Sequence, residues 1–217
     1  MNTNTWKDIP QTKMYWVDRP NSDRKMDRNK ESKNWIEDYK NSVNHPHRKK
    51  TLEILRRLEP SSLLEVGANC GPNLALIQAA FPHMTLKGIE PSRQAAFAGA
   101  TEEYDILIGD ASHLPFGIGA FDCVLADAVL MYVPPEEIRD AMREICRVAK
   151  KHVILVEWHD ESVEGVVKDF HYARNYTKHL EYYGFEVEMI KITEEMWPTE
   201  KWVNNGYYYV GTKNHVG

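Results

Sequence analysis

The sequence has few cysteines, no long apolar run and no excess of basic residues, and each shortage excludes a class of protein. Cysteine occurs three times, at positions 70, 123 and 146, without a CxxC pair, which excludes a disulfide framework. We expect reduced thiols, with Cys123 and Cys146 as small core residues. No apolar run approaches the length of about 18 residues that a membrane-spanning helix needs. Because the N-terminus also lacks a basic segment followed by an apolar one, we expect a cytoplasmic protein without a membrane partner.

The charge balance argues against a protein whose main task is to hold nucleic acid. Lys and Arg number 27 against 32 Asp and Glu, which gives a net charge of -5 and a pI near 6.0. Binding to a phosphate backbone needs a net basic face, so we expect no nucleic-acid partner. The hydrophobic content of 42% is that of an ordinary globular chain, and 217 residues are enough for one domain with a modest extension.

The extension lies at the N-terminus, around a polar segment. Residues 20–33 contain one apolar residue and charges of both signs, so this segment cannot anchor a core. Aromatic residues flank it, Tyr15 and Trp16 before it and Trp35 after it, and either docking against the core or a place in a lid would account for them. We predict an N-terminal lid over residues 1–45 and a main domain over residues 46–217.

The main domain alternates between strand and helix patterns. Continuous apolar strands separated by helices predict a parallel sheet covered on both faces. Between the last two strands, residues 193–205 offer no helix-length segment, so these strands are expected to pair antiparallel. The predicted strands are Ser61–Val66, Thr85–Ile89, Asp105–Ile108, Phe121–Ala126, His152–Val156, Phe185–Ile192 and Tyr207–Thr212. The predicted helices begin at Pro46, Gly71, after Pro91 and at Pro135, and a further helix ends near Tyr183.

The first predicted strand runs into a glycine-containing turn, Glu65-Val66-Gly67-Ala68-Asn69-Cys70-Gly71, which opens directly into a helix. Glycines at such a turn let a ligand approach the backbone, whose free amides face it. The next strand ends in Glu90, 23 residues after Gly67, where a carboxylate can accept both hydroxyl protons of a ribose. A dinucleotide oxidoreductase fits less well, because its fingerprint requires glycine where Asn69 and Pro72 stand.

These residues resemble the class I S-adenosylmethionine-dependent methyltransferases, from Ser61 to about Val156 with a compatible tail to Thr212. The resemblance implies a Rossmann-like α/β fold with a seven-stranded sheet of order 3-2-1-4-5-7-6, its last strand antiparallel. The family's middle glycine is replaced by Asn69, a residue type that tolerates a left-handed backbone. The cofactor implied is S-adenosyl-L-methionine, with S-adenosyl-L-homocysteine as product. The resemblance implies that the cofactor contacts Glu65, Gly67, Ala68, Asn69 and Gly71 in the turn, Glu90 at the ribose, Pro91, Asp110 and Ala111 at the adenine, and Asp127 at the methionine end.

The sequence constrains the methyl acceptor less than it constrains the cofactor. The Asn/Asp-Pro-Pro-Tyr motif of enzymes that methylate exocyclic or amide nitrogens is missing, and Ala126-Asp127-Ala128-Val129 stands in its place. We therefore expect a small or medium polar acceptor, methylated at oxygen more readily than at nitrogen, such as a sugar or a natural-product hydroxyl. A hydroxyl acceptor needs a base, for which His159 and His171 have the appropriate titration range. Tyr132 stands where many relatives carry histidine.

Several alternatives stay open at this point. The chain could keep the cofactor pocket for regulation without catalysis, or bind a nicotinamide cofactor. Glu157, His159, Asp160 and Asp127 lack metal-motif spacing, so we expect no metal. The basic residues Arg48, Lys49, Lys50, Arg56 and Arg57 form either a solvated helix face or a site for an anionic group. All six tryptophans lie outside the segment expected to hold the cofactor, which places aromatic surface where an acceptor would be enclosed.

Overall fold

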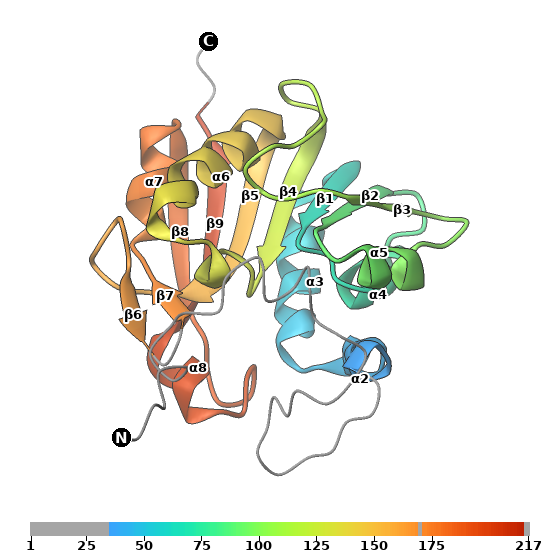
Figure 1. The fold of residues 1–217 in the computed structure, drawn as a ribbon, viewed down its shortest axis with the longest axis horizontal. Helices are drawn as coiled ribbons and strands as arrows, with labels where there is room; N and C mark the ends of the chain where they lie inside the picture. Colours follow the sequence, from blue (N-terminus) through green and yellow to red (C-terminus); the bar gives the residue numbers. More distant parts are fainter. Residues whose placement is uncertain (1–34, 169–170, 215–217) are drawn as a thin grey trace, which may run out of the picture.

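The computed structural model describes residues 35–168 and 171–214 (Figure 1). Tyr15, Trp16 and the polar segment at residues 20–33 lie outside the described residues, so the proposed lid is described only from Trp35 onward. That part consists of α2 (Trp35–Asn41) and the short 3-10 helix η2 (Ser42–Asn44). Trp35 and Ile36 of α2 pack against Cys70 and Ala95. The lid itself remains a prediction.

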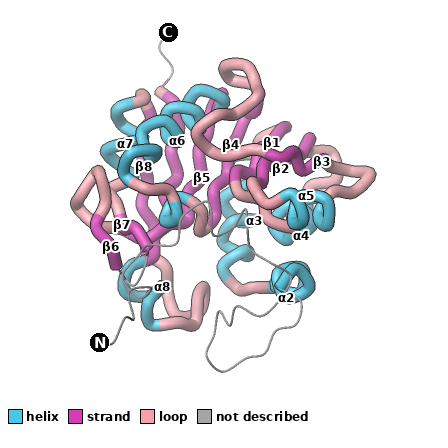
Figure 2. Tube along the Cα trace, viewed as in Figure 1, coloured by secondary structure: helices cyan, strands magenta, loops and turns pink. Residues whose placement is uncertain are grey.

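The remaining elements follow the alternation expected from the sequence (Figure 2). Strands and helices alternate through most of the chain. No strand bound differs from the predicted one by more than three residues. The strands are β1 (Ser62–Val66), β2 (Thr85–Glu90), β3 (Asp105–Ile108), β4 (Phe121–Asp127), β5 (Ala149–Trp158), β6 (Val166–Lys168), β7 (His171–Ala173), β8 (Phe185–Lys191) and β9 (Gly206–Lys213). The helices are α3 (His47–Leu58), α4 (Pro72–Ala80), α5 (Arg93–Gly99), α6 (Pro135–Val148), α7 (Tyr176–Tyr182), α8 (Glu200–Asn205) and the 3-10 turn η3 (Leu130–Tyr132).

Seven strands form one sheet in the order β3-β2-β1-β4-β5-β9-β8. The first five strands pair in parallel, and β9 lies antiparallel between β5 and β8. With β8 and β9 counted as the sixth and seventh strands, this is the predicted order 3-2-1-4-5-7-6. The Rossmann-like fold class is therefore confirmed.

Side chains of each central strand alternate between two apolar layers, because successive residues of a strand point to opposite faces. Leu63 and Leu125 pack with α3 and α4 on one face of the sheet. Leu64 and Val124 pack with α6 and α7 on the other face. Cys123 and Cys146 are buried, one in each layer, which confirms them as small core residues.

Two segments differ from the sequence prediction. The linker between β8 and β9 contains the six-residue helix α8, where no helix was expected, because Trp202 anchors it by burial against the core. The predicted antiparallel pairing of β8 and β9 is unaffected. The segment after β5, where no strand was predicted, contains the hairpin of β6 and β7, which forms a separate two-stranded sheet.

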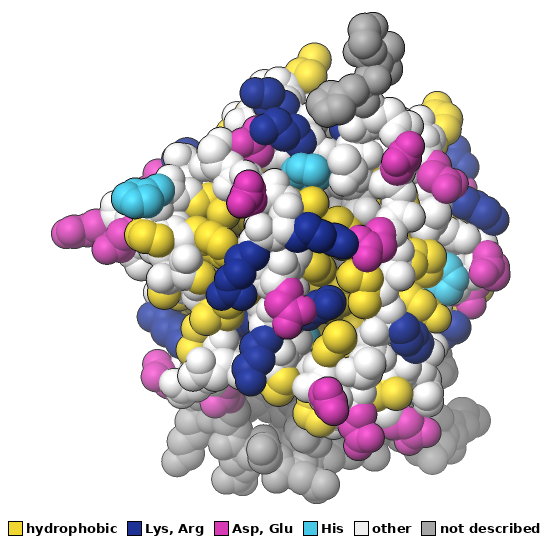
Figure 3. All heavy atoms as spheres, turned by 180° about the vertical axis from the view of Figure 1, so that it is seen from behind, with side chains coloured by type: hydrophobic (Ala, Val, Ile, Leu, Met, Phe, Trp, Pro, Cys, Tyr) yellow, Lys and Arg dark blue, Asp and Glu magenta, His cyan; other side chains and the backbone are white. Residues whose placement is uncertain are grey.

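The rear face of the molecule shows no dominant charge (Figure 3). On the rear face, Lys and Arg side chains are interspersed with Asp and Glu (Figure 3). Arg57 of α3, for example, pairs with Glu188 of β8 at 2.5 Å. Among the described helices, none is long and apolar enough to cross a membrane.

We predict that Gly99→Ala lowers the free energy of unfolding by about 1–3 kcal/mol, the usual cost of overpacking a core. A Cβ atom at Gly99 would lie 2.5 Å from the carbonyl carbon of Cys70 and 2.7 Å from its Cα, and backbone atoms cannot move aside cheaply. Urea unfolding followed by circular dichroism measures the change. Gly117→Ala is the control, because nothing lies within 4 Å of the added atom there. Equal stability of the two variants would contradict the close contact between α5 and the turn.

Candidate functional site

A cavity of about 850 Å³ lies at the carboxyl ends of β1, β2, β4 and β5. The strand order reverses between β1 and β4, since β2 and β3 continue on one side of β1 while β4 and β5 continue on the other. Open α/β sheets bind their ligands at this switch point, outside the carboxyl ends of the strands. Residues of α2, α3 and the β8–β9 linker complete the walls.

The turn after β1 has the backbone that the sequence predicted. Gly67, Asn69 and Gly71 have φ angles of 75°, 51° and 74°, so Asn69 adopts the left-handed conformation in place of the family's glycine. The amides of Gly67 and Ala68 donate to the carbonyl of Ile89 at 2.7 and 2.9 Å. Gly67, Ala68 and Asn69 line the cavity, whereas Gly71 lies outside the lining and forms the N-cap of α4.

Glu90 lies at the end of β2 with both carboxylate oxygens engaged by backbone amides. Asn69 N–H donates to one oxygen at 2.9 Å and Ser92 N–H to the other at 2.8 Å. The residue is 4% exposed, and this burial raises the pKa of Glu90 to about 7 against the effect of the two amides. Each oxygen keeps a second lone pair, so the carboxylate can still accept a hydroxyl proton at each oxygen.

The adenine end of the predicted site also lies in the cavity. Pro91, Asp110 and Ala111 all line it. One oxygen of Asp110 accepts the amide of Ser112 at 2.9 Å, which orients its carboxylate beside the backbone of Ala111. The predicted positions from Glu65 to Asp127 are thus brought to one cavity, with the exception of Gly71.

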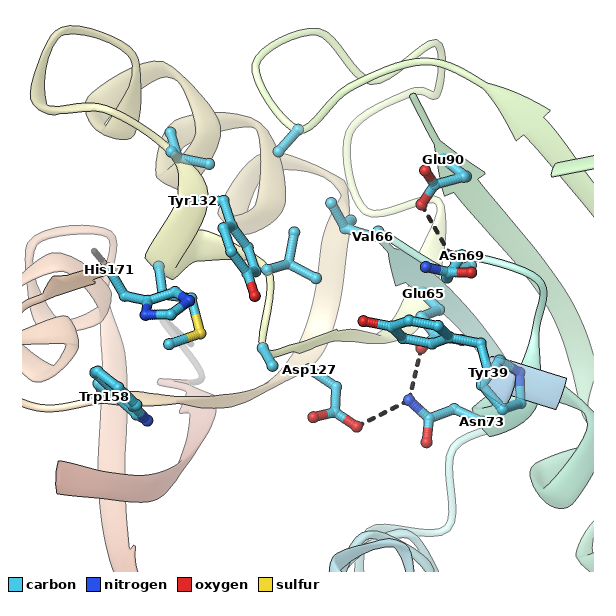
Figure 4. Close-up of a pocket in the computed structure, with 18 of the residues that line it drawn as sticks. Tyr39, Glu65, Val66, Asn69, Asn73, Glu90, Asp127, Tyr132, Trp158 and His171 are labelled. Atoms are coloured by element: carbon cyan, nitrogen blue, oxygen red, sulfur yellow. Dashed lines mark hydrogen bonds between the residues drawn. The ribbon is translucent and has the colours of Figure 1, made fainter. Parts of the chain in front are cut away.

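Two buried carboxylates meet at the floor of the cavity (Figure 4). The side-chain amide of Asn73 donates to Glu65 at 2.7 Å and to Asp127 at 2.9 Å. The second oxygen of each carboxylate, Glu65 Oε2 and Asp127 Oδ1, is buried and has no hydrogen-bond partner within the described residues. Unsatisfied buried acceptors of this kind favour a ligand that brings N–H donors.

Helix α3 supports this floor through residues that the sequence analysis did not assign to the site. Arg48 donates to the Asn73 side-chain oxygen at 2.6 Å and to the Ser42 carbonyl at 2.5 Å. The His47 ring lies 2.7 Å from Asp127 Oδ2. Arg48 is therefore buried, not part of a solvated basic face. In the sequence, a basic residue on a helix looks the same whether it is solvated or supports a buried site, so the pattern could not predict this role.

The two floor carboxylates titrate in opposite directions. Burial raises the pKa of Glu65 to about 8. Burial also opposes ionisation of Asp127, but contacts with His47, Arg48 and Asn73 outweigh it and hold its pKa at about 2. At neutral pH the floor thus holds one ionised carboxylate and one protonated one, which avoids two adjacent buried charges.

Aromatic side chains form the wall opposite the floor. Trp158 meets His171 edge to face with centroids 5.0 Å apart, and His171 meets Tyr132 in the same way at 5.1 Å. Trp202 stacks on Trp197 at 3.8 Å and meets Trp158 at 6.0 Å. Three of the tryptophans noted in the sequence thus lie in the cavity wall, as expected.

The candidate bases separate in the structure. His171 and Tyr132 line the cavity. His159 does not: its Nδ1 lies 2.7 Å from the Tyr209 hydroxyl, and its backbone forms a bridge with Arg174. The expectation that His159 lies at the site is therefore corrected, because the chain has already passed the end of β5 and turned away from the cavity. Within the described ranges, no three His, Cys, Asp or Glu side chains gather to hold a metal ion.

The loop after β4 is held by two buried charged residues from other elements. The Glu157 carboxylate accepts the amides of Val129, Leu130 and Met131 at 2.8, 2.7 and 3.1 Å. Arg174 donates to the carbonyls of Leu130 and Val133. Burial raises the pKa of Glu157 to about 8, although the three amides favour its ionised form. This arrangement fixes the loop that carries Tyr132 into the cavity.

Comparison with known proteins agrees with this geometry. Residues 64–156 match the family described as methyltransferase domain. No curated protein matches the chain by sequence. The fold is similar to that of the cyclase SpnF, with a TM-score of 0.65 and 18% identity, over 96% of this chain and 99% of that one. It is also similar to magnesium protoporphyrin IX methyltransferase from Synechocystis PCC 6803, with a TM-score of 0.63 and 13% identity, over 98% and 100% of the two chains. A chain from the Haloferax volcanii complex with the methyltransferase activator Trm112 has a TM-score of 0.64 and 18% identity, over 83% and 96%.

Residues 64–156 thus match the methyltransferase-domain family, and the sheet has the fold of class I methyltransferases. Such domains use S-adenosylmethionine as the methyl donor, and the Synechocystis protein was determined with S-adenosylhomocysteine bound. The family match begins in β1 and ends in β5, so it includes the glycine turn, Glu90, Asp110 and Asp127. Wall residues Trp197 and Trp202 lie beyond it.

One observation shows that the cavity fits this cofactor. The orphaned oxygens of Glu65 and Asp127 suit an α-ammonium group, which brings three donors. Separately, glycine at position 67 lets the turn pack against the loop after β4, because a Cβ atom there would lie 2.4 Å from a methyl carbon of Val129.

Arg174→Met is expected to lower the free energy of unfolding by about 3 kcal/mol, because three carbonyls lose charged donors and that of Leu130 stays buried. Arg174→Lys should lower the free energy of unfolding less, because lysine keeps the positive charge and one N–H donor that can reach a carbonyl. Urea unfolding at pH 7 measures both variants. Arg139→Met removes an exposed ion pair with Glu164 and should change stability by less than about 0.5 kcal/mol. A similar loss in the Arg139 and Arg174 variants would show that the loop is not held in this way.

Proposed function

We propose that this chain transfers a methyl group from S-adenosylmethionine to a hydroxyl of a small or medium polar acceptor. The observation that carries the proposal is the pair of buried, unpartnered oxygens on Glu65 and Asp127 in a cavity that Glu90 also lines. A cavity with these acceptor groups suits a ligand with an ammonium group and a ribose.

The cofactor residues have separate roles in this proposal. Glu90 accepts the two ribose hydroxyl protons, while Pro91, Asp110 and Ala111 contact the adenine. Asp127 accepts protons of the amino group, and the ammonium charge beside Glu65 favours the ionised form of that carboxylate, which then accepts another. Because Asn73 holds these two carboxylates in place before a ligand enters, little reorganisation is needed on binding. When bound, the cofactor supplies an electrophilic methyl carbon.

The remaining residues align the acceptor and exclude water, which is most of what methyl transfer requires from a protein. The wall of Trp158, Trp197 and Trp202 covers the reacting centre. Oxygen is the favoured acceptor atom because the nitrogen-specific Asn/Asp-Pro-Pro-Tyr sequence is missing and an imidazole is at hand. His171, with Tyr132 beside it, is the candidate to take the hydroxyl proton as the new oxygen–carbon bond forms.

A second function is favoured by one comparison. The similar structure of SpnF is named as a cyclase, so this fold also carries a chemistry other than methyl transfer. A chain that binds the cofactor without transferring its methyl group would bind S-adenosylhomocysteine yet yield no labelled product from methyl-labelled cofactor across a panel of phenols, sugars and amines. Labelled product from any of them would support methyl transfer.

We predict that Glu90→Ala weakens S-adenosylhomocysteine binding by about 1–3 kcal/mol, the range for hydrogen bonds to a charged group. Isothermal calorimetry measures the affinity. Glu102→Ala, an exposed substitution beyond the cavity, is the control and should bind as the unaltered protein does. Unchanged affinity in the Glu90 variant would remove it from the site. Tight binding of NAD(H) with no binding of S-adenosylhomocysteine would instead indicate an oxidoreductase.

The affinity for S-adenosylhomocysteine should rise as the pH increases from 6 to 8. The pKa of Glu90 is raised to about 7 in the free protein, and hydroxyl donors bind its ionised form. Binding therefore releases a proton at low pH, which weakens affinity by at most about tenfold per pH unit below the pKa. Calorimetry at several pH values should give a flatter profile for Glu90→Gln. An identical slope in both proteins would contradict hydroxyl binding by Glu90.

A further inference from the structure

The indole nitrogen of Trp158 is buried and has no hydrogen-bond partner within the described residues, and Trp158 is one of the residues that line the cavity. Trp158 is the last residue of β5 and is 2% exposed. A buried donor without a partner costs about 1–3 kcal/mol, so native structures rarely leave one without a reason. Since the residue borders the cavity, a bound molecule can supply the missing acceptor.

Neighbouring rings hold this donor in one orientation. The plane of the His171 ring lies at 63° to the Trp158 indole, and the plane of the Trp202 indole lies at 76° to it. Both contacts are therefore edge to face. Trp202 is in turn stacked on Trp197, which stacks on His47 at 4.3 Å. A donor fixed in this way loses little entropy when it binds an acceptor.

The shape of the surrounding wall favours a flat partner. Trp158 and His171 lie on one side of the cavity, and Asp127, Asn73 and Tyr39 lie on the other (Figure 4). Faces and edges of aromatic rings pack best against another planar π system, by stacking or edge-to-face contact. A conjugated ring therefore suits the space beside Trp158 better than a saturated, highly hydroxylated one.

The charges in the cavity narrow the choice further. An N–H donor needs a lone pair, which an ammonium or other cationic group does not offer. A buried anion needs a cationic partner, and Arg48 in the cavity lining already donates to Asn73 and to the Ser42 carbonyl. A neutral oxygen satisfies both conditions. The oxygen that binds the indole N–H should differ from the oxygen that is methylated, because the attacking oxygen needs its lone pair for the methyl carbon.

We propose that the acceptor is a neutral, planar conjugated compound with a carbonyl-type oxygen that the Trp158 indole N–H holds. This assignment rests on the proposed methyl transfer and names the substrate class of that site. It makes Trp158 a residue that determines specificity, while His171 and Tyr132 remain the candidates for proton removal. A sugar, which lacks both a planar ring and a carbonyl in its cyclic form, is disfavoured as acceptor.

Three bicyclic probes of similar size separate the contributions. Coumarin has a neutral carbonyl, naphthalene has no acceptor, and N-methylquinolinium carries a positive charge. Their binding is measured by equilibrium dialysis with saturating S-adenosylhomocysteine present. We expect coumarin to bind about 3- to 10-fold more tightly than naphthalene, the worth of one net hydrogen bond. N-methylquinolinium should bind no more tightly than naphthalene.

The variant Trp158→Phe tests the residue itself, since it keeps an aromatic ring and removes only the N–H and part of the surface. The ratio of coumarin to naphthalene affinity should fall to about one. Trp197→Phe is the matched control: it also removes a cavity indole, but one whose nitrogen is not an orphaned buried donor, so the ratio should persist. Far-UV circular dichroism and thermal melting show that both variants are folded.

The outcomes distinguish this inference from the proposed function. If the unaltered protein binds S-adenosylhomocysteine but does not prefer coumarin to naphthalene, the acceptor assignment is wrong and the cofactor assignment stands. A preference that survives Trp158→Phe, or tightest binding of N-methylquinolinium, also overturns the assignment. If the unaltered protein does not bind S-adenosylhomocysteine, the proposed function itself fails.

Discussion

The cavity depends on one amide group, that of Asn73, between two buried carboxylates. Glu65 and Asp127 lie on the neighbouring strands β1 and β4, whose parallel pairing brings their carboxyl ends together. Two unscreened carboxylates at this depth would repel each other. The Asn73 amide donates to both, and its own oxygen accepts from Arg48, so α3 and α4 are tied to the same point of the sheet. Cofactor site and helix positions are thus consequences of one hydrogen-bonded cluster.

The aromatic wall is continuous with this cluster. His47 contacts Asp127 through its ring nitrogen and carries Trp197 on its face. From there, stacked and edge-to-face contacts lead through Trp202 to Trp158. Polar floor and apolar wall therefore share a residue, and a shift of α3 would disturb both. This coupling links the end of the cavity that suits the cofactor to the end that suits an acceptor.

The loop after β4 is held in a conformation that its own residues do not favour. Ala128 has a φ angle of 55°, which costs energy for a residue with a Cβ atom. The Glu157 carboxylate accepts hydrogen bonds from three of the loop's amides, and Arg174 donates to two of its carbonyls. These hydrogen bonds offset the backbone strain. A loop fixed before a ligand arrives needs little ordering on binding, which suits a site that must align two reactants.

Apolar periodicity in the sequence determined the succession of strands and helices, and residue types at the strand ends placed the turn at Asn69 and the carboxylate of Glu90. The resemblance of these motifs to class I methyltransferases implied the strand order and the position of Asp110. The tertiary structure decided which residues surround them. Arg48 reaches Asn73 across 25 residues and His47 reaches Asp127 across 80, and no local pattern reports contacts at such separations. His159 and His171 look alike in sequence, yet only His171 faces the cavity, because the turn after Trp158 and the hairpin of β6 and β7 set their directions. Periodicity encodes which face of an element is buried, whereas the partner across that face depends on how the whole sheet and its helices pack.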